Sequence, residues 1–315
     1  MAQRNAAPDL TVHLLREGIP ESCHTASVAV CDRRGRVLLS AGDVNASTFI
    51  RSSLKPFQAF AVASTGVLEH YGMTDLDLAL MSASHQGSIE QARRVFRILW
   101  CCDLEPGYLQ CPIPEGKKSA LEHNCSGKHA GMLAVCQLRN WPLGDYLSPS
   151  HPVQQLILEK LAEMLHIPAA EFLVARDDCG APTYLMSLTQ MASLYGQLAS
   201  GDNLELERIV RAMTQHPEYV GGEGHFDTEL MRISGGTLVS KAGAEGIQCV
   251  GRVGEGTGLA IKVADGAKRA KYAVAIHVLR QMGWLAPEAA DTLADTFLTL
   301  SHYKRLDVVG DLAIV

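Results

Sequence analysis

The stretch SVAVCDRRGRVLLSAGD, residues 27–43, decides the fold class. Arg33, Arg34 and Gly35 separate two apolar segments with a tight-turn composition, so the stretch predicts an antiparallel hairpin. Extended segments punctuated by glycine return late in the chain, in GGTLVSKAG (235–243) and GLAIKVADG (258–266). Strands near both chain ends predict one mainly antiparallel sheet that both ends build.

Helical patterns fill the rest of the chain. Apolar residues have helical spacing in four stretches: ARRVFRILW (92–100), VQQLILEKLAEML (153–165), PTYLMSLTQMASLYGQL (182–198) and AKYAVAIHVLRQMGW (270–284). Ser88 and Gln91 form a capping-box pattern ahead of the first, and Pro152 suits the first turn of the second. We therefore predict an α/β (α+β) protein with a single domain over residues 1–315, in which helices cover the sheet and the central stretch forms a helical lobe.

Composition narrows the classes of partner. The 315 residues carry a formal net charge of -6, and scattered basic residues argue against a nucleic-acid or anionic-membrane partner, which leaves a small-molecule substrate. The N-terminus has no apolar signal-peptide core, and no apolar run is long enough to cross a bilayer. Nine cysteines, including the adjacent Cys101 and Cys102, fit a reducing compartment better than a disulfide framework. We expect a cytoplasmic protein.

A serine and a lysine lie one helical turn apart in RSSLKPFQAF, residues 51–60. Ser52 or Ser53 could simply cap a helix, with Lys55 in solvent. Alternatively, the spacing places Ser52 and Lys55 on one helix face, where a neutral amine could deprotonate the hydroxyl. The same spacing recurs in SHYK (301–304) with nothing reactive nearby, so spacing alone does not decide between the two.

The wider context favours chemistry. Reactive residue types gather in six short stretches punctuated by glycine or proline: RSSLKP at 51, SASHQG at 82, HNCSGKHAGM at 123, DDCGAPT at 177, KAGAEG at 241 and GLAIKVADG at 258. Each alone could be structural. Together they are typical of a serine and lysine amidohydrolase, which needs a nucleophile, an amine base, a second cation and an oxyanion site.

This ordered set of motifs resembles the rhizobial-type (class 3) L-asparaginases, over about residues 50–266. The resemblance implies the fold of serine β-lactamases and serine-dependent glutaminases, a homodimer, and hydrolysis of L-asparagine to L-aspartate and ammonia. It implies two catalytic Ser-Lys pairs, Ser52 with Lys55 and Ser84 with Lys262. It also implies a zinc (Zn2+) site formed by Cys125, Lys128 and Cys179.

The metal site has alternatives on the sequence alone. From spacing, Cys125, His129 and Cys179 would be the ligands, because histidine binds zinc far more often than lysine does. The resemblance puts Lys128 in place of His129. The two cysteines could also be buried free thiols, or Cys125 could be a nucleophile served by His129.

The catalytic and substrate roles follow from charge. A lysine with an ordinary pKa of about 10.4 is protonated at pH 7, so a basic Lys55 requires burial or neighbouring cations, of which Arg51 and Lys262 are available. We expect Arg51 to bind the substrate α-carboxylate and Asp177 its α-amine, with His85 as a further substrate contact.

Two other functions stay open. One is a glutaminase or penicillin-recognising hydrolase, because Lys241 in KAG resembles the K-T-G strand of those enzymes, although alanine replaces the hydroxyl residue. The other is a non-catalytic, zinc-stabilised binding protein.

Overall fold

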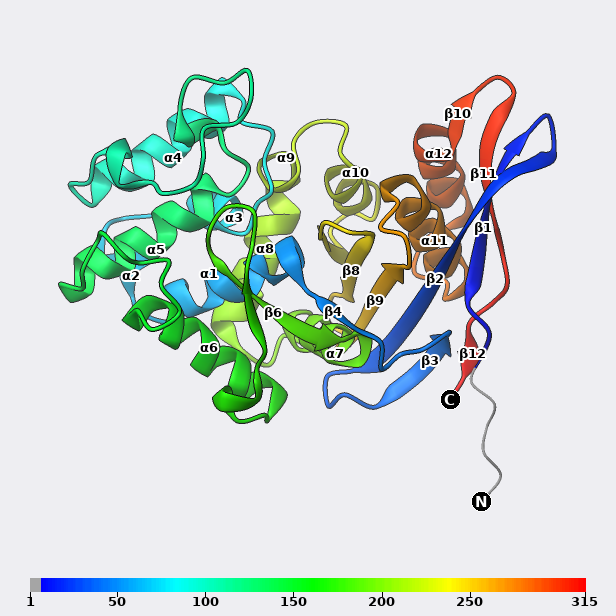
Figure 1. Ribbon diagram of the computed structural model, residues 1–315, viewed down its shortest axis with the longest axis horizontal. Helices are drawn as coiled ribbons and strands as arrows, with labels where there is room; N and C mark the ends of the chain where they lie inside the picture. Colours follow the sequence, from blue (N-terminus) through cyan, green and yellow to red (C-terminus); the bar gives the residue numbers. More distant parts are fainter. Residues whose placement is uncertain (1–6) are drawn as a thin grey trace. The chain divides into compact units, whose positions relative to one another are not determined.

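The computed structural model describes residues 7–315 (Figure 1). Residues 1–6, at the N-terminus where the sequence shows no apolar signal-peptide core, lie outside the described residues. The chain divides into two compact units. The sheet unit consists of the described residues up to Ser53, then Met186–Asp202 and Glu229–Val315. The helical unit consists of Leu54–Leu185 and Asn203–Thr228.

The sheet unit contains an antiparallel sheet to which both chain ends contribute. Its strands are β1 (Leu10–Arg16), β2 (Ile19–Asp32), β3 (Val37–Ala41), β7 (Leu238–Ala242), β8 (Ile247–Arg252), β9 (Thr257–Val263), β10 (Thr299–Ser301), β11 (Lys304–Val309) and β12 (Ala313–Ile314). The order is β10-β11-β1-β2-β9-β8-β7, and β3 pairs with both β2 and β12. Because β2 pairs with β9, and β1 with β11, the predicted sheet built from both ends is confirmed.

The predicted hairpin over residues 27–43 is formed by β2 and β3. Its turn is stabilised by the Asp32 carboxylate, which accepts hydrogen bonds from the backbone N–H groups of Arg34 and Arg36. Gly35 takes the left-handed backbone conformation, with φ of 80°, that a tight turn requires. Residues 28–31 of β2 are all buried, and this continuous burial shows that both faces of the strand are covered.

Helices α7 (Leu188–Leu198) and α11 (Lys268–Gln281) pack against this sheet, and α12 (Pro287–Phe297) packs against α11. The prediction of a single helix over 182–198 is wrong in its first third. Residues Pro182–Ser187 form strand β6, which pairs with β5 (Val174–Arg176), and the helix begins only after Ser187. Ser187 and Gln190 form a capping box, which is the local signal for this start.

The helical unit contains the elements between β4 (Ser47–Phe49) and β5, together with two later helices. Its helices are α1 (Lys55–Ala63), α2 (Val67–His70), α3 (Asp75–Met81), α4 (Ile89–Cys101), α5 (Ser126–Arg139), α6 (Pro152–Leu165), α8 (Leu204–Gln215) and α9 (Pro217–Val220). Short 3-10 turns lie at Pro106–Tyr108, Ala120–Glu122 and Ala169–Glu171, and α10 (Phe226–Ile233) contains the boundary between the units.

The predicted helices over 92–100 and 153–165 lie within α4 and α6, and the capping box of Ser88 and Gln91 is present. All nine residues of α1 are buried, and α1 contacts α3, α5, α6 and α8. Helix α1 is therefore the core of the helical unit. Among residues 7–315, every helix is too short or too polar to cross a membrane.

Candidate active site

The motif RSSLKP begins with a 3-10 turn, Arg51–Leu54, and continues as α1 from Lys55. Ser52 and Ser53, either of which could cap a helix on the sequence alone, therefore lie within the 3-10 turn, three and two residues before the first α-helical residue. Pro56 lies in the first turn of α1, where its missing N–H costs no helical hydrogen bond. The boundary between the two units falls between Ser53 and Leu54, so Ser52 belongs to the sheet unit and Lys55 to the helical unit.

The Lys55 amine is fully buried in the helical unit, among three oxygen atoms. Its Nζ lies 2.6 Å from the carbonyl oxygen of Ala83, 3.1 Å from that of Asn124 and 2.9 Å from Ser84 Oγ. An ammonium satisfies all three by donating. A neutral amine donates to the two carbonyls and accepts from the Ser84 hydroxyl, so this geometry suits both states of a base.

The electrostatic surroundings favour the neutral amine. Burial is the largest effect and lowers the pKa of Lys55. The charge of Cys125 and a hydrogen bond with its side chain oppose the shift, and the Lys128 ammonium reinforces it. The direction of this shift is the one that a lysine base requires.

The hydroxyl that contacts Lys55 comes from Ser84, in the loop that follows α3. The Ser84 backbone N–H donates to the carbonyl of Val220, 2.8 Å away, which holds this loop in place. The sequence analysis pairs Lys55 with Ser52, and Ser84 with Lys262. The structure brings Lys55 and Ser84 together, while the two predicted pairings stay predictions.

His85 connects the same loop to α5. Its Nδ1 accepts from the Gly87 backbone N–H, and its Nε2 lies 2.9 Å from Ser126 Oγ. The Ser126 hydroxyl donates to the carbonyl of Leu121, so Nε2 carries the ring proton and donates. Burial, reinforced by the charge of Lys55, lowers the pKa of His85 to about 3. Both ring nitrogens are engaged in this neutral ring, which gives no support to the predicted substrate contact.

The predicted metal ligands form one buried group in the helical unit. Cys125 is the N-cap residue of α5, and Lys128 lies in the first turn of that helix. Cys179 lies in the turn between β5 and β6, where the Asp177 N–H donates to the Ala181 carbonyl at 2.8 Å. Asp177 is predicted to bind the substrate amine, and its Oδ2 lies 4.0 Å from Lys128 Nζ.

Charges within this group are strongly coupled. A hydrogen bond with the Cys179 thiol, the Lys128 cation and, when it is protonated, Lys55 lower the pKa of Cys125, although burial opposes the shift. The same hydrogen bond, and burial, raise the pKa of Cys179. Burial lowers the pKa of Lys128, but the charges of Cys125, Cys179 and Asp177 outweigh it and raise the pKa. These shifts favour a thiolate at Cys125, a thiol at Cys179 and an ammonium at Lys128.

These residues fit a zinc ion. Two sulfur donors and one nitrogen donor converge in a buried site, and zinc binds sulfur and nitrogen ligands. Among the described residues, no group of three or more His, Cys, Asp or Glu side chains is placed to hold a metal, so the set depends on Lys128. The alternative set with His129 is therefore not assembled, and His129 Nδ1 lies instead 2.7 Å from the Tyr146 hydroxyl.

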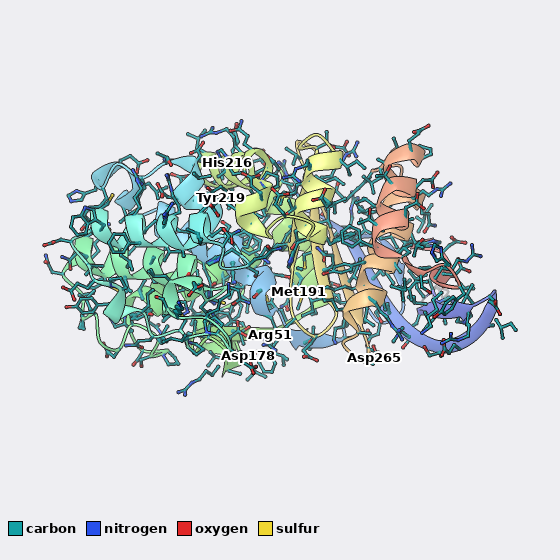
Figure 2. All side chains as sticks on the ribbon, turned by 90° about the horizontal axis from the view of Figure 1, so that it is seen from above. Arg51, Asp178, Met191, His216, Tyr219 and Asp265 are labelled. Carbon is teal, nitrogen blue, oxygen red and sulfur yellow. The ribbon has the colours of Figure 1, made fainter. Side chains whose placement is uncertain are left out.

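The sheet unit contains the other predicted residues. Arg51, labelled in Figure 2, has a left-handed backbone with φ of 53°. Lys262 lies on β9, where its Nζ donates to the carbonyls of Glu245 at 2.6 Å and Val263 at 2.8 Å. Burial lowers the pKa of Lys262, against the charges of Glu245 and Asp265.

Lys241 on β7 was not among the predicted site residues. It is fully buried, and its carbonyl accepts a 3.0 Å hydrogen bond from Ser53 Oγ, next to Ser52 in the chain. The signal for Lys241 in the sequence was the likeness of KAG to a K-T-G strand. Lys241 is therefore a second candidate for the role of second catalytic lysine, which the resemblance gives to Lys262.

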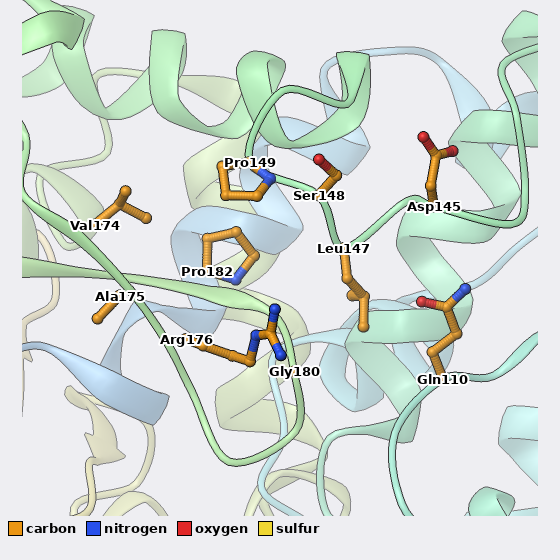
Figure 3. A pocket seen from close by; sticks show the side chains of 10 residues that line it. All are labelled: Gln110, Asp145, Leu147, Ser148, Pro149, Val174, Ala175, Arg176, Gly180 and Pro182. Atoms are coloured by element: carbon orange, nitrogen blue, oxygen red, sulfur yellow. The ribbon is translucent and has the colours of Figure 1, made fainter.

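A cavity of about 650 Å³ borders the Cys179 turn in the helical unit (Figure 3). Arg176, Gly180 and Pro182 line it together with residues of the loop at 145–149. These three residues flank Asp177 and Cys179 in the sequence, but the predicted site residues are not among those that line the cavity.

Comparison with known proteins identifies the family. The model of the L-asparaginase II family matches residues 12–314. No curated protein sequence matches the chain.

Similar solved structures include Mglu in its native form with 4.3 M NaCl, with 16% identity, a TM-score of 0.38, and coverage of 82% of this chain and 61% of that chain. A second structure of native Mglu has 17% identity and a TM-score of 0.37, and the match covers 82% of this chain and 65% of that chain. The chain therefore spans less than two thirds of the length of these structures. On the evidence of the family model, which covers nearly all of its length, the chain belongs to the L-asparaginase II family.

Proposed function

We propose that the protein is an amidohydrolase that converts L-asparagine to L-aspartate and ammonia through an acyl-enzyme. Membership of the L-asparaginase II family supports the reaction class. The observation that carries the mechanism is the contact of 2.9 Å between Lys55 Nζ and Ser84 Oγ, because a fully buried amine with a lowered pKa touches a hydroxyl there. Such a pair can both remove and return a proton.

In the proposed reaction, neutral Lys55 removes the proton of Ser52, and Ser52 Oγ attacks the side-chain amide carbon. Ser84 gives its hydroxyl proton to the leaving nitrogen as the C–N bond breaks and receives the proton that Lys55 took from Ser52, so that ammonia departs and Lys55 is neutral again. Water, deprotonated by the same amine, then hydrolyses the ester and releases L-aspartate. The roles of Arg51 and Asp177 in binding the α-carboxylate and α-amine remain part of the proposal.

Cys125, Lys128 and Cys179 would hold zinc close to this base, since the charge of Cys125 acts on Lys55. When bound, zinc supplies positive charge that favours thiolates and a neutral Lys128 amine. Asp177, close to Lys128, would then keep its carboxylate near the substrate amine. None of the proposed proton transfers uses a metal ligand.

We further propose that asparagine is preferred over glutamine. A site that binds both α-groups and the amide fixes the length of the substrate, and one more methylene displaces the amide carbon. Purified protein should release ammonia from L-asparagine with a higher kcat/KM than from L-glutamine, and should leave a chromogenic β-lactam intact. Equal values for the two amides would contradict the preference, and cleavage of the lactam alone would favour the penicillin-recognising alternative.

The residue that carries the acyl group during turnover is the nucleophile. Mass spectrometry of enzyme quenched during turnover should find the adduct on the peptide that contains Ser52. An adduct on Ser84 would exchange the two serine roles, and one on Cys125 would replace the serine mechanism. Ser301→Ala and Lys304→Ala are matched controls, because this pair has the same spacing and should leave kcat unchanged.

The second lysine is tested by comparing two variants. The hydrogen bond from Ser53 to the Lys241 carbonyl fixes the backbone of Lys241 beside the segment that carries Ser52, and this proximity is the basis for testing Lys241 against Lys262. We expect Lys241→Met to lower kcat more than Lys262→Met does. The opposite order would support the pairing of Lys262 with Ser84.

A further inference from the structure

Residues 243–247, which are the turn between β7 and β8 and the first residue of β8 and are called the 243–247 turn below, are held by lysines from two other elements. Lys271 of α11 donates to the carbonyls of Gly243 at 2.7 Å and Ile247 at 3.1 Å. Lys262 of β9 donates to the carbonyl of Glu245 at 2.6 Å. Three of the five carbonyls of this turn therefore accept from ammonium groups.

Lys271 is nearly fully buried, and this burial is costly for a cation. Its two carbonyl acceptors belong to one turn, and the Gly243 N–H donates to the same Ile247 carbonyl at 2.9 Å. The amine also lies 5.5 Å from the centre of the Tyr272 ring. An apolar side chain in its place would leave both carbonyls without this donor, so the ammonium determines the shape of the turn.

The turn contacts the segment that carries Ser52. A Cβ atom at Gly243 would lie 3.0 Å from both the Ile50 carbonyl oxygen and Ser53 Oγ, so Gly243 allows this segment to approach closely. Ser53 is fixed twice more, through its hydroxyl on the Lys241 carbonyl and through its own carbonyl, which accepts from the Tyr195 hydroxyl at 2.8 Å. The position of Ser52 therefore depends on where residues 241–243 lie.

We propose that Lys271 is a positioning residue for catalysis: by holding the 243–247 turn, it keeps the Arg51–Leu54 turn, and with it Ser52, in place. This proposal rests on the proposed function, in which Ser52 is the nucleophile. Lys271 acts through the backbone and transfers no proton.

The test compares Lys271→Met and Lys271→Arg with Lys268→Met, a matched control because Lys268 is an exposed lysine of the same helix. Backbone hydrogen exchange is measured over residues 50–54 and 243–247, and kcat and KM are measured with L-asparagine. Lys271→Met should speed exchange in both segments and lower kcat by roughly 10- to 100-fold, since a small misplacement of a reacting group has effects of this size. KM should change less than kcat.

Lys271→Arg should recover most of the exchange protection and of kcat, because a guanidinium can donate to both carbonyls. The shape of the pH–rate profile should be the same in all variants, which separates positioning from proton transfer. If Lys271→Met does not fold, Lys271→Gln replaces it, since the amide retains one donor site for the turn.

Wild-type exchange over 243–247 in a folded Lys271→Met or Lys271→Gln variant would overturn the proposal, and so would an unchanged kcat. The proposed function fails separately, if the wild-type enzyme hydrolyses no amide. In that case, backbone hydrogen exchange over residues 50–54 in wild type and in the Lys271 variants would still decide whether Lys271 holds this segment.

Discussion

The oxygen atoms around the Lys55 amine are arranged to suit a primary amine. Of its three oxygen neighbours, two are carbonyls, which can only accept, and the third is the Ser84 hydroxyl; the amine also makes a hydrogen bond with the Cys125 side chain. A base at this position must donate twice and accept once. A neutral primary amine does this, whereas a guanidinium has no acceptor.

We therefore expect Lys55→Arg to fail almost as completely as Lys55→Met, each with a loss of kcat of about 10³-fold or more, as is typical when a member of a catalytic unit is removed. Steady-state ammonia release gives kcat, and thermal unfolding shows whether each variant is folded. A folded Lys55→Arg enzyme with near wild-type kcat would show that Lys55 is not the base.

The lowered pKa of Lys55 also predicts the pH dependence of activity. Burial moves the pKa below the usual lysine value of about 10.4, and the base form is the active one. The value of kcat/KM should thus rise with pH through this lowered pKa and level off above it. Activity that rises only near the ordinary lysine pKa would contradict the shift.

The lowered pKa of Lys55 should also make the free energy of unfolding depend on pH. Between the two pKa values the unfolded chain binds more protons than the folded protein does, so the free energy of unfolding rises with pH in that window. Urea unfolding of wild type and Lys55→Met should give a difference in stability that changes with pH in this direction.

At the scale of elements, local signals were sufficient where they were unambiguous. The turn residues at 33–35 predicted the hairpin, and the capping box of Ser88 and Gln91 predicted the start of α4. The predicted helix over 182–198 is wrong in its first part because the apolar spacing of a short strand can match a helical pattern. The capping box of Ser187 and Gln190 is the local signal that marks the true start of α7.

Part of the candidate site could not be read from local patterns. Lys55 and Ser84 are 29 residues apart, and their contact depends on how α1, α3 and the loop after α3 pack. Motifs therefore indicated which residues take part, whereas tertiary packing decides which of them touch.

The contact between α7 and the sheet supports another prediction. A Cβ atom at Gly258 of β9 would overlap the backbone of Ala192 and Gly196 in α7, and backbone cannot move aside as a side chain can. Gly258→Ala should destabilise the protein by about 1–3 kcal/mol or more, the cost of overpacking a core. Urea unfolding measures this loss. Gly107→Ala is the control, because nothing lies within 4 Å of the added atom, and an equal loss in both variants would contradict the packing argument.

At the scale of the whole molecule, the two units divide the predicted residues. The sheet unit contains Ser52 and both candidate second lysines, Lys241 and Lys262. The helical unit contains the proposed base Lys55, Ser84 and the predicted zinc ligands. The homodimer implied by the family resemblance remains a prediction that light scattering can check.

Because the predicted zinc ligands belong to the helical unit alone, metal removal should act there first. Without metal, a thiolate, a thiol and an ammonium remain buried together, and Asp177 faces Lys128. We expect chelation, Cys125→Ala or Cys179→Ala to lower the unfolding temperature and to raise KM for L-asparagine more than they lower kcat, since neither Ser52, Ser84 nor Lys55 is a ligand.

Elemental analysis of protein purified without chelator should find about one zinc per chain, as a single site with three protein ligands requires. Cys136→Ala is the matched control, because this buried cysteine lies on α5 outside the predicted ligand set and should leave the zinc content unchanged. Protein without zinc would remove the metal site from the proposal. If the chelated enzyme binds substrate and unfolds normally but has almost no turnover, the metal takes part in the chemical step. Positioning by the metal predicts instead that KM rises more than kcat falls.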